Sequence, residues 1–378
     1  MGRFGIYVHI PFCKQKCKYC DFVSFAKYEE KYKEYIECLI NEIKSKKIEN
    51  EPMVNTIYLG GGTPSILGSE DIVKIIEAIK ERFNLEENCE ITIEINPGTI
   101  TKNKLEDYRK VGINRLSIGL QSTNNRILKL IGRIHSYQEF LETYEMAKEV
   151  GFENINIDLM LAIPTQTEEE LLESVQKVID LNPNHISLYS LILEEGTELE
   201  KLISKGEYKL LNEEIERDMY WKTKKLLEIN KYNHYEISNF SKKGFESKHN
   251  FDCWNQEQYI GFGLAAHSYY NDIRFSNIYN LENYIKNIKN NQIEKNIEIN
   301  EIQDKPAKMR EFMMIGLRKI DGVKISDFER KFRINPLFYF RFEISKLTEE
   351  DLIEVDLDNI KLTEKGLDLA NQVFEEFI

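Results

Sequence analysis

The chain has 378 residues, of which 42% are hydrophobic, so it is long and apolar enough to form two or three domains with a core, and disorder throughout is excluded. Its 51 Lys and Arg against 64 Asp and Glu give a net charge of −13, which disfavours nucleic acid as a partner. No segment approaches the roughly 18 consecutive apolar residues of a membrane-spanning helix, and the N-terminus does not read as a secretion signal. We therefore expect a cytoplasmic protein.

The first half of the chain alternates short β-branched segments with longer amphipathic segments, and this pattern repeats six times. The expected strands are Phe4–Ile10, Thr56–Leu59, Glu90–Ile95, Arg115–Leu120, Asn154–Leu159 and Ile186–Ile192. The expected helices include Tyr28–Lys47, Ser69–Arg82, Lys102–Val111, Tyr137–Val150 and Glu168–Asp180. Because helical crossovers join parallel strands, the pattern predicts an α/β fold, and we favour a barrel or partial barrel over an open sheet.

The second half is mainly helical. A helix is expected over Asn212–Ile229, an irregular polar stretch over Tyr232–Lys248, and a helix with a connector over Asn280–Asp304. The last segment has expected helices at Ala307–Lys319, Ile325–Lys331, Phe338–Glu350 and Thr363–Phe377, with a hairpin of Ile353–Val355 and Asn359–Leu362. We therefore expect a core barrel (residues 1–230), a connecting region (231–300) and a mostly helical, winged-helix-like C-terminal domain (301–378).

Three of the six cysteines, Cys13, Cys17 and Cys20, lie within eight residues directly after the first expected strand. Thiolates at this C-x3-C-x2-C spacing are typical ligands of zinc or of an iron–sulfur cluster. Zinc would need a fourth ligand, for which His9 is the nearby candidate, whereas three ligands on a four-iron cluster leave one iron open. We favour the cluster. The scattered Cys38, Cys89 and Cys253 are expected to be small buried residues.

The segment YVHIPFCKQKCKYC, which ends at Cys20, resembles the cluster loop of the radical S-adenosylmethionine enzymes. Its first half, YVHIPFC, is similar to that of oxygen-independent coproporphyrinogen III oxidases and related haem chaperones, and the resemblance extends over essentially the whole chain. It implies a partial (β/α)6 TIM-like barrel, a [4Fe-4S] cluster held by Cys13, Cys17 and Cys20, bound S-adenosylmethionine and an electron donor for the cluster.

Polar residues near the carboxyl ends of the expected strands are candidates for a cofactor site, since ligands of such barrels bind at that end. The Gly60-Gly61-Gly62-Thr63-Pro64 turn permits close backbone approach, although three glycines also suit an ordinary tight turn. Polar groups inside apolar strands need a partner, either within the protein or in a ligand. The resemblance implies contacts to S-adenosylmethionine or an adjacent ligand from Tyr7, Tyr19, Gly61, Gly62, Thr63, Glu94, Gln121, Arg133 and Asp158.

The segment KHNFDCW, which begins at Lys248, resembles the HNxxYW element that is associated with haem binding in the chaperone branch. Imidazole is a suitable haem ligand, and aromatic side chains can line a pocket for the macrocycle. Cys253 stands where the element has tyrosine, so a phenol is lost and a possible thiolate ligand is gained. The candidate haem residues are His249, Cys253 and Trp254. The iron ligand stays open between His249, Cys253, His267 and no residue of this region.

Two functions of different class follow from the resemblance. A haem chaperone binds haem as cargo and delivers it to acceptor haemoproteins, including acceptors at a membrane, whereas an oxidase decarboxylates propionate side chains in porphyrin biosynthesis. The 12 residues before Cys13 and the Asp21-Phe22 pair after Cys20 favour the chaperone, because the oxidases have a longer extension and a further cysteine there. A tRNA-modifying enzyme is disfavoured by the net charge and by the acidic C-terminal segment.

Overall fold

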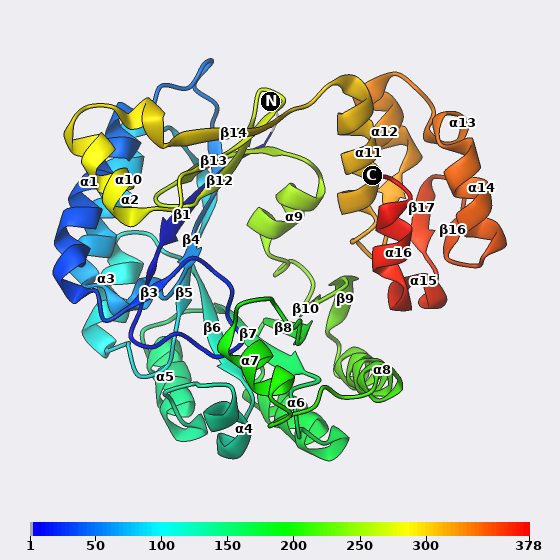
Figure 1. The fold of residues 1–378 in the computed structure, drawn as a ribbon, viewed down its shortest axis with the longest axis horizontal. Coiled ribbons are helices and arrows are strands. Elements are labelled where there is room, and N and C mark those ends of the chain that lie inside the picture. Colours follow the sequence, from blue (N-terminus) through cyan, green and yellow to red (C-terminus); the bar gives the residue numbers. More distant parts are fainter. Residues whose placement is uncertain (1–2) are drawn as a thin grey trace.

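In the computed structural model, which describes residues 3–378, six parallel strands form the centre of one large sheet (Figure 1). They lie side by side in chain order: β1 (Phe4–Ile10), β4 (Val54–Gly61), β5 (Leu85–Ile95), β6 (Arg115–Gln121), β7 (Asn154–Leu161) and β8 (His185–Ser190). The crossovers between them contain α1 (Tyr32–Ser45), α2 (Ser69–Arg82), α3 (Lys102–Lys110), α4 (Asn125–Leu130), α5 (Tyr137–Glu149) and α6 (Glu168–Leu181). The predicted partial (β/α)6 barrel is confirmed.

Alternation along the strands gives the barrel an apolar outside and a polar inside. In β7, Ile155 and Ile157 are buried in the main hydrophobic core, while Asn156 and Asp158 between them hydrogen-bond to each other. The covering helices begin where the sequence supplies caps, for example at Ser136, whose side chain forms a capping box with Glu139 at the start of α5. The polar residues that interrupt the apolar strands therefore collect inside the barrel.

The sheet continues beyond the six parallel strands at both edges. In residues 3–378, β11 (Gln258–Phe262) pairs in parallel with β1 and is followed outward by the antiparallel strands β12 (His267–Tyr270), β13 (Ile273–Asn277) and β14 (Ile297–Ile302). At the other edge, β10 (Asn239–Ser241) and β9 (Asn233–Glu236) follow β8. Much of the expected connecting region therefore belongs to the same sheet, and the boundary at residue 230 stays a prediction. These strands are short or largely exposed, which explains why their pattern is weak.

Four further helices complete this part of the chain: α7 (Glu198–Ser204), α8 (Glu213–Ile229), α9 (Lys248–Trp254) and α10 (Leu281–Lys289). The structure confirms the predicted helix over Asn212–Ile229, and Asn212 caps it by accepting from the backbone N–H of Glu214. No helix of residues 3–378 combines the length and the apolar character needed to cross a bilayer.

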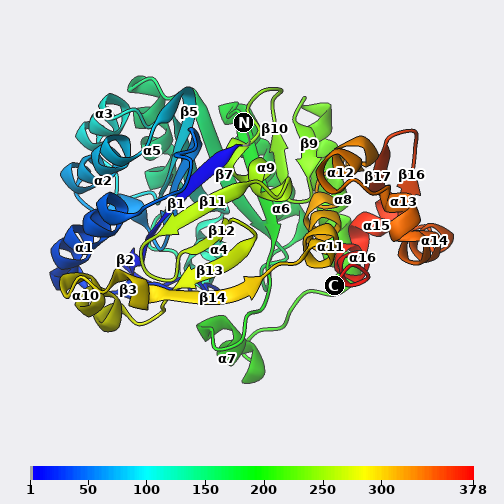
Figure 2. The same ribbon diagram turned by 90° about the horizontal axis from the view of Figure 1, so that it is seen from above.

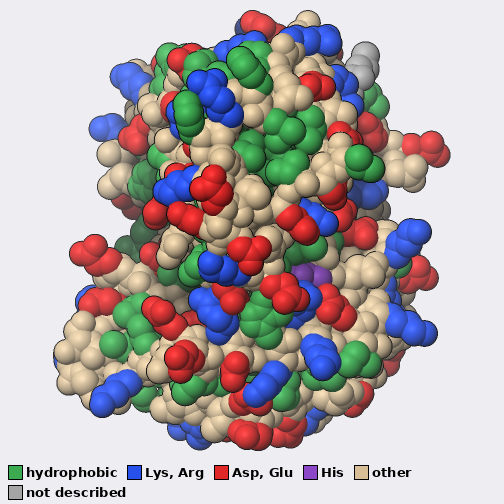
Figure 3. Space-filling view, turned by 90° about the vertical axis from the view of Figure 1, so that its right-hand side faces the viewer, with side chains coloured by type: hydrophobic (Ala, Val, Ile, Leu, Met, Phe, Trp, Pro, Cys, Tyr) green, Lys and Arg blue, Asp and Glu red, His purple; other side chains and the backbone are tan. Residues whose placement is uncertain are grey.

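The C-terminal domain is mostly helical and has its own hydrophobic core, as predicted. Its helices are α11 (Lys305–Gly316), α12 (Ile325–Phe332), α13 (Pro336–Tyr339), α14 (Arg341–Glu349), α15 (Glu364–Asp368) and α16 (Ala370–Glu375). Its small antiparallel sheet consists of β15 (Val323–Lys324), β17 (Asn359–Leu362) and β16 (Ile353–Val355), in that order. The expected last helix is divided into α15 and α16. On the face of the molecule where the C-terminal domain lies, charged side chains of both signs are interspersed, and apolar side chains gather on the upper part (Figure 3).

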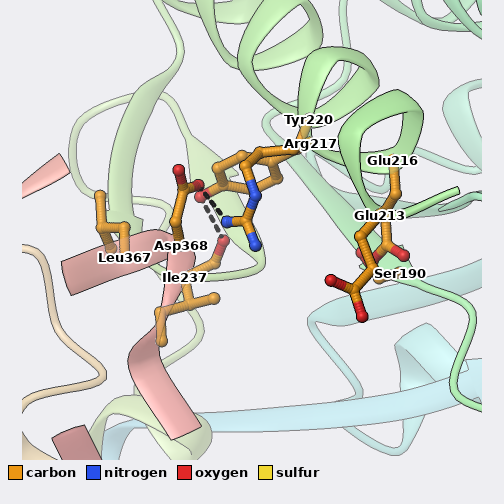
Figure 4. Close-up of a pocket in the computed structure, with 8 residues that line it drawn as sticks. All are labelled: Ser190, Glu213, Glu216, Arg217, Tyr220, Ile237, Leu367 and Asp368. Carbon is orange, nitrogen blue, oxygen red and sulfur yellow. Dashed lines mark hydrogen bonds and ion pairs between the residues drawn. The ribbon is translucent and has the colours of Figure 1, made fainter. Parts of the chain in front are cut away.

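Two backbone hydrogen bonds join the C-terminal domain to the edge of the large sheet. The N–H of Ile237 donates to the carbonyl of Arg318 at 3.1 Å, and the N–H of Ile320 donates to the carbonyl of Tyr235 at 3.1 Å. A second junction lies between α8 and α15, where Arg217 forms an ion pair with Asp368 at 2.6 Å beside a cavity (Figure 4). These contacts hold the domain against the barrel.

Candidate functional site

The three clustered cysteines lie on a loop at the carboxyl end of β1. Cys13 is buried in the two-residue strand β2 (Phe12–Cys13), which pairs with β3 (Phe25–Ala26), and Cys17 and Cys20 are partly exposed. The loop is fastened at Lys18, whose N–H donates to the carbonyl of Ile131 at 3.0 Å. A cavity of about 310 Å³ borders Cys17 and Cys20. All three side chains are free thiols, so they are available as ligands.

His9 is not available as a fourth zinc ligand, because both ring nitrogens are already engaged. Its Nδ1 lies 2.9 Å from the hydroxyl of Tyr7, and its Nε2 lies 2.9 Å from the carbonyl oxygen of Val23. Within residues 3–378, no three His, Cys, Asp or Glu side chains are grouped as a site for a single metal ion. The zinc alternative therefore lacks His9 as its fourth ligand. A cluster, in contrast, takes its thiolates at separate iron atoms.

The glycine turn after β4 packs directly against Cys13. The N–H of Gly62 donates to the carbonyl of Ile10 at 2.9 Å, and the N–H of Thr63 donates to that of Phe12 at 2.8 Å. A Cβ at position 62 would lie 2.7 Å from the Phe12 carbonyl oxygen and 3.0 Å from Cys13 Sγ, so only glycine fits without a shift. The Thr63 hydroxyl donates a hydrogen bond to Cys13 Sγ at 3.5 Å. The turn thus positions the first cysteine.

Arg133 links the cysteine loop to the end of β6. Its Nη1 donates to Cys17 Sγ at 3.5 Å, and its Nη2 donates to Asn96 Oδ1 and to the carbonyl of Gly119. Among residues 3–378, its Nε is buried without a partner, as is Oε1 of Gln121, whose backbone has a positive φ of 73°. Unpartnered buried polar atoms beside a glycine turn are what a bound polar ligand would satisfy. These residues therefore fit S-adenosylmethionine next to the cluster loop.

Asn96 is a site residue that the sequence reasoning missed. Its Nδ2 donates to Thr63 Oγ1 at 2.8 Å while its Oδ1 accepts from Arg133, so it connects the glycine turn to the arginine. The sequence feature that could have identified it is its position directly after β5, at the carboxyl end of the strands where the other candidates lie. Tyr19 lies near this group, and burial raises the pKa of its phenol well above the usual value.

Glu94, Asp158 and Tyr7 face the barrel interior. The Tyr58 hydroxyl donates to Glu94 Oε1 at 2.8 Å, and the N–H of Gly61 donates to Oε2 at 3.2 Å. Burial, aided by the negative charge of Asp158, raises the pKa of Glu94 to about 7 despite these bonds. Burial also raises the pKa of Asp158. The two carboxyls therefore keep protons more readily than exposed ones.

The predicted haem residues on α9 lie away from the cysteine loop. His249 Nδ1 lies 2.9 Å from Thr56 Oγ1, near the start of β4, and the imidazole is buried and stacked on Tyr58. Thr56 and Gly61 are five residues apart on β4, which is about 17 Å along a strand. Burial lowers the pKa of His249 to about 4, so the ring is neutral. A haem ligand role for His249 stays a prediction.

Cys253 and Trp254 also face protein. Burial raises the pKa of the Cys253 thiol to about 12, so the thiolate expected from the sequence is not favoured in this environment. Trp254 packs under the guanidinium of Arg318, 4.6 Å from the ring centroid. His267 is exposed on β12, where its Nε2 lies 3.1 Å from the Tyr279 hydroxyl. The structure thus does not bring the predicted haem residues together with the cluster loop.

Comparison with known proteins identifies the family of this chain. Residues 7–178 match the radical SAM superfamily, and residues 303–369 match the HemN C-terminal domain. The chain is 40% identical to the heme chaperone HemW of Lactococcus lactis subsp. lactis (strain IL1403), over 98% of this chain and 96% of the relative. It is 35% identical to HemW of Bacillus subtilis (strain 168), over 98% of both chains. The chain belongs to the HemW family.

The fold of this HemW family member is similar to that of coproporphyrinogen III oxidase (HemN) from Escherichia coli. The TM-score is 0.85 at 23% identity, and the match covers 100% of this chain and 90% of the oxidase. At this identity the likeness concerns the fold. Membership of the radical SAM superfamily implies S-adenosylmethionine and a [4Fe-4S] cluster as cofactors. The cysteine loop, the glycine turn and Arg133 fit both cofactors.

Proposed function

We propose that this protein is a haem chaperone, which binds haem and passes it to acceptor haemoproteins. The observation that carries the proposal is the 40% identity to a heme chaperone HemW, since it extends over 98% of this chain and so includes the barrel, α9 and the C-terminal domain. The acceptors include haemoproteins at a membrane, and a separate protein donates electrons to the cluster. Six free cysteines suit a reducing cytoplasm.

In this proposal Cys13, Cys17 and Cys20 hold the [4Fe-4S] cluster, and the neighbouring residues orient them. Thr63 donates to Cys13, and Arg133 donates to Cys17, so two of the three sulfurs already have a hydrogen-bond donor. When bound, the cluster supplies an electron to S-adenosylmethionine. The assigned cofactor contacts are Tyr7, Tyr19, Gly61, Gly62, Thr63, Glu94, Gln121, Arg133 and Asp158. The assigned haem contacts are His249, Cys253 and Trp254.

Anaerobic haem titration of the cluster-loaded protein tests the proposed function. We expect a stoichiometric shift of the Soret band, followed by transfer of haem to an added apo-haemoprotein. In parallel, the protein is incubated with coproporphyrinogen III, S-adenosylmethionine and a reductant. Decarboxylation of coproporphyrinogen III without a stable haem complex would contradict the proposal and favour the oxidase. The Cys17→Ala variant should lose four-iron absorbance, whereas Cys38→Ala, at a buried cysteine of α1, should retain it.

A further inference from the structure

A second cavity lies outside the cluster region, between α9 and the C-terminal domain. Its volume is about 670 Å³, which is within the range of about 300–1,000 Å³ that is typical of small-molecule sites. Aromatic side chains line it from three elements: Tyr235 from β9, Phe251 from α9 and Phe312 from α11. The backbone hydrogen bonds between residues 235–237 and 318–320 fix one of its walls. The cavity is therefore built into the junction between the two parts of the chain.

In the part of the chain that the structure describes, two lysines of this cavity have only neutral hydrogen-bond partners. The ammonium group of Lys319 donates to Asn255 Oδ1 at 2.6 Å, and that of Lys331 donates to the carbonyl of Gln256 at 3.1 Å. Neither has a carboxylate within 4 Å among residues 3–378. A cation partly removed from water without a counter-charge is costly, and an anionic ligand would offset that cost.

Each lysine also lies over an aromatic ring that lines the cavity. The Nζ of Lys319 is 5.7 Å from the centroid of Phe251, and the Nζ of Lys331 is 5.0 Å from that of Phe312. Positive charge thus stands next to flat apolar surface at two places in one cavity. This combination suits a planar apolar ligand that carries two carboxylates.

Four carboxylates also line the cavity, and among residues 3–378 none of them forms an ion pair with Lys319 or Lys331. Asp327 forms an ion pair with Arg330 at 2.8 Å. Glu246 accepts from the N–H of Gly244 at 3.0 Å. Burial raises the pKa of Glu257, and the positive charge of Lys331 opposes this shift. Asp321 is the remaining carboxylate, and it lies beyond ion-pair distance of Lys319. The two lysines therefore keep their capacity for a ligand.

We propose that this interdomain cavity holds the haem cargo, with the propionates on Lys319 and Lys331 and the macrocycle against Phe251 and Phe312. The inference rests on the proposed function, and it places the cargo in this cavity instead of on the contacts His249, Cys253 and Trp254 that the sequence resemblance implies. Helix α9 then has two roles: it presents Phe251 to the cavity, while His249 on the same helix faces the barrel interior. Recognition acts through carboxylates and ring faces, so the cavity accepts a porphyrin without iron.

The test is fluorescence titration of the cluster-loaded full chain with iron-free protoporphyrin IX, beside absorbance titration with haem. We expect Lys319→Gln and Lys331→Gln each to weaken binding of both ligands by about tenfold or more, since each removes a charge-assisted hydrogen bond. The matched control is Lys365→Gln, because Lys365 is exposed in the same domain and also donates to a backbone carbonyl, that of Glu350. Its affinity should equal that of the wild type.

A measurement on the wild type alone guards against misfolded variants. Protoporphyrin IX dimethyl ester has no carboxylates, so it should bind the wild type at least tenfold more weakly than the free acid does. Equal binding of acid and ester, or wild-type haem affinity in the Lys319→Gln/Lys331→Gln double variant, would overturn the cavity as the cargo site and leave the proposed function intact. If the wild type binds no haem, the proposed function itself fails.

Discussion

The guanidinium of Arg133 donates to the sulfur of Cys17 across 3.5 Å, although the two residues are 116 positions apart in the chain. The same side chain also bonds Asn96 and the carbonyl of Gly119. Because guanidinium stays charged at all physiological pH values, a fixed positive charge faces a sulfur that we expect to bind iron as thiolate. The unpartnered Nε of Arg133 leaves further donor capacity for the carboxylate of a ligand.

We therefore predict that Arg133→Met weakens the affinity for S-adenosylmethionine by roughly 10- to 100-fold, which corresponds to loss of one or two hydrogen bonds of a charged donor. Equilibrium dialysis of the cluster-loaded protein measures this affinity, and iron per chain is determined alongside. The matched control is Arg126→Met, because Arg126 lies nearby on α4 but pairs with Glu170 on the surface. An unchanged affinity in Arg133→Met, with the cluster retained, would refute the assignment.

A second prediction concerns the glycine turn. Gly62→Ala places a methyl group 2.7 Å from the Phe12 carbonyl oxygen, so the cysteine loop has to shift. We expect a severalfold lower iron content after reconstitution and a loss of about 1–3 kcal/mol in the free energy of unfolding, as for other overpacked sites. In the control Gly68→Ala, the nearest atom would be 3.6 Å away, and the expected loss is below about 1 kcal/mol. Equal iron contents in the two variants would contradict a positioning role for the turn.

The parallel strands and many site residues were predictable because they depend on local pattern. Glu94 and Asp158 stand out as carboxylates inside apolar strands, and the structure places both in the polar barrel interior. Asn96 does not stand out, since it begins an Asn-Pro turn that looks ordinary. Its role depends on meeting Arg133, 37 positions further along the chain, and local pattern carries no information about that contact.

The edge strands and α9 show the same limit. Every residue of β14 except Ile297 is exposed, so the strand has no buried face and no alternation to detect. On α9, the HN pair resembles a haem-binding element, but Thr56, 193 positions earlier, occupies one imidazole nitrogen of His249. Whether a histidine is free to bind a ligand depends on tertiary packing, which the sequence pattern does not determine.

Glu94 leads to a prediction about pH. Its pKa is about 7, so the carboxyl is half protonated near neutral pH and loses acceptor capacity as the pH falls. We expect the Kd for S-adenosylmethionine to rise by up to about tenfold per pH unit below 7 and to level off above about pH 8. Equilibrium dialysis from about pH 6 to 8.5 measures the effect, with cluster absorbance as the check on integrity.

The variant Glu94→Gln separates this titration from that of the ligand's own amino group. Because glutamine does not ionise, the variant should show only the pH dependence of the ligand. Tyr58→Phe removes a hydrogen bond that favours the ionised form, so it should move the midpoint to higher pH. Parallel pH profiles in the wild type and Glu94→Gln would show that Glu94 does not control binding.

The last prediction concerns Glu42, which holds the region of the outer strands β11–β14 against the barrel. This buried side chain of α1 accepts from the N–H of Gly263 at 2.8 Å, from the Tyr284 hydroxyl at 2.6 Å and from Asn277 Nδ2 at 2.6 Å. Glu42→Ala removes the shared acceptor of these three buried donors, so we expect a loss of about 3–5 kcal/mol in the free energy of unfolding, measured with urea. Glu34→Ala, on the same helix, removes only partly exposed ion pairs with Lys31 and Lys289 and should cost less than about 1 kcal/mol. Similar losses in the two variants would mean that the outer strands hold to the barrel through apolar packing, independently of this carboxylate.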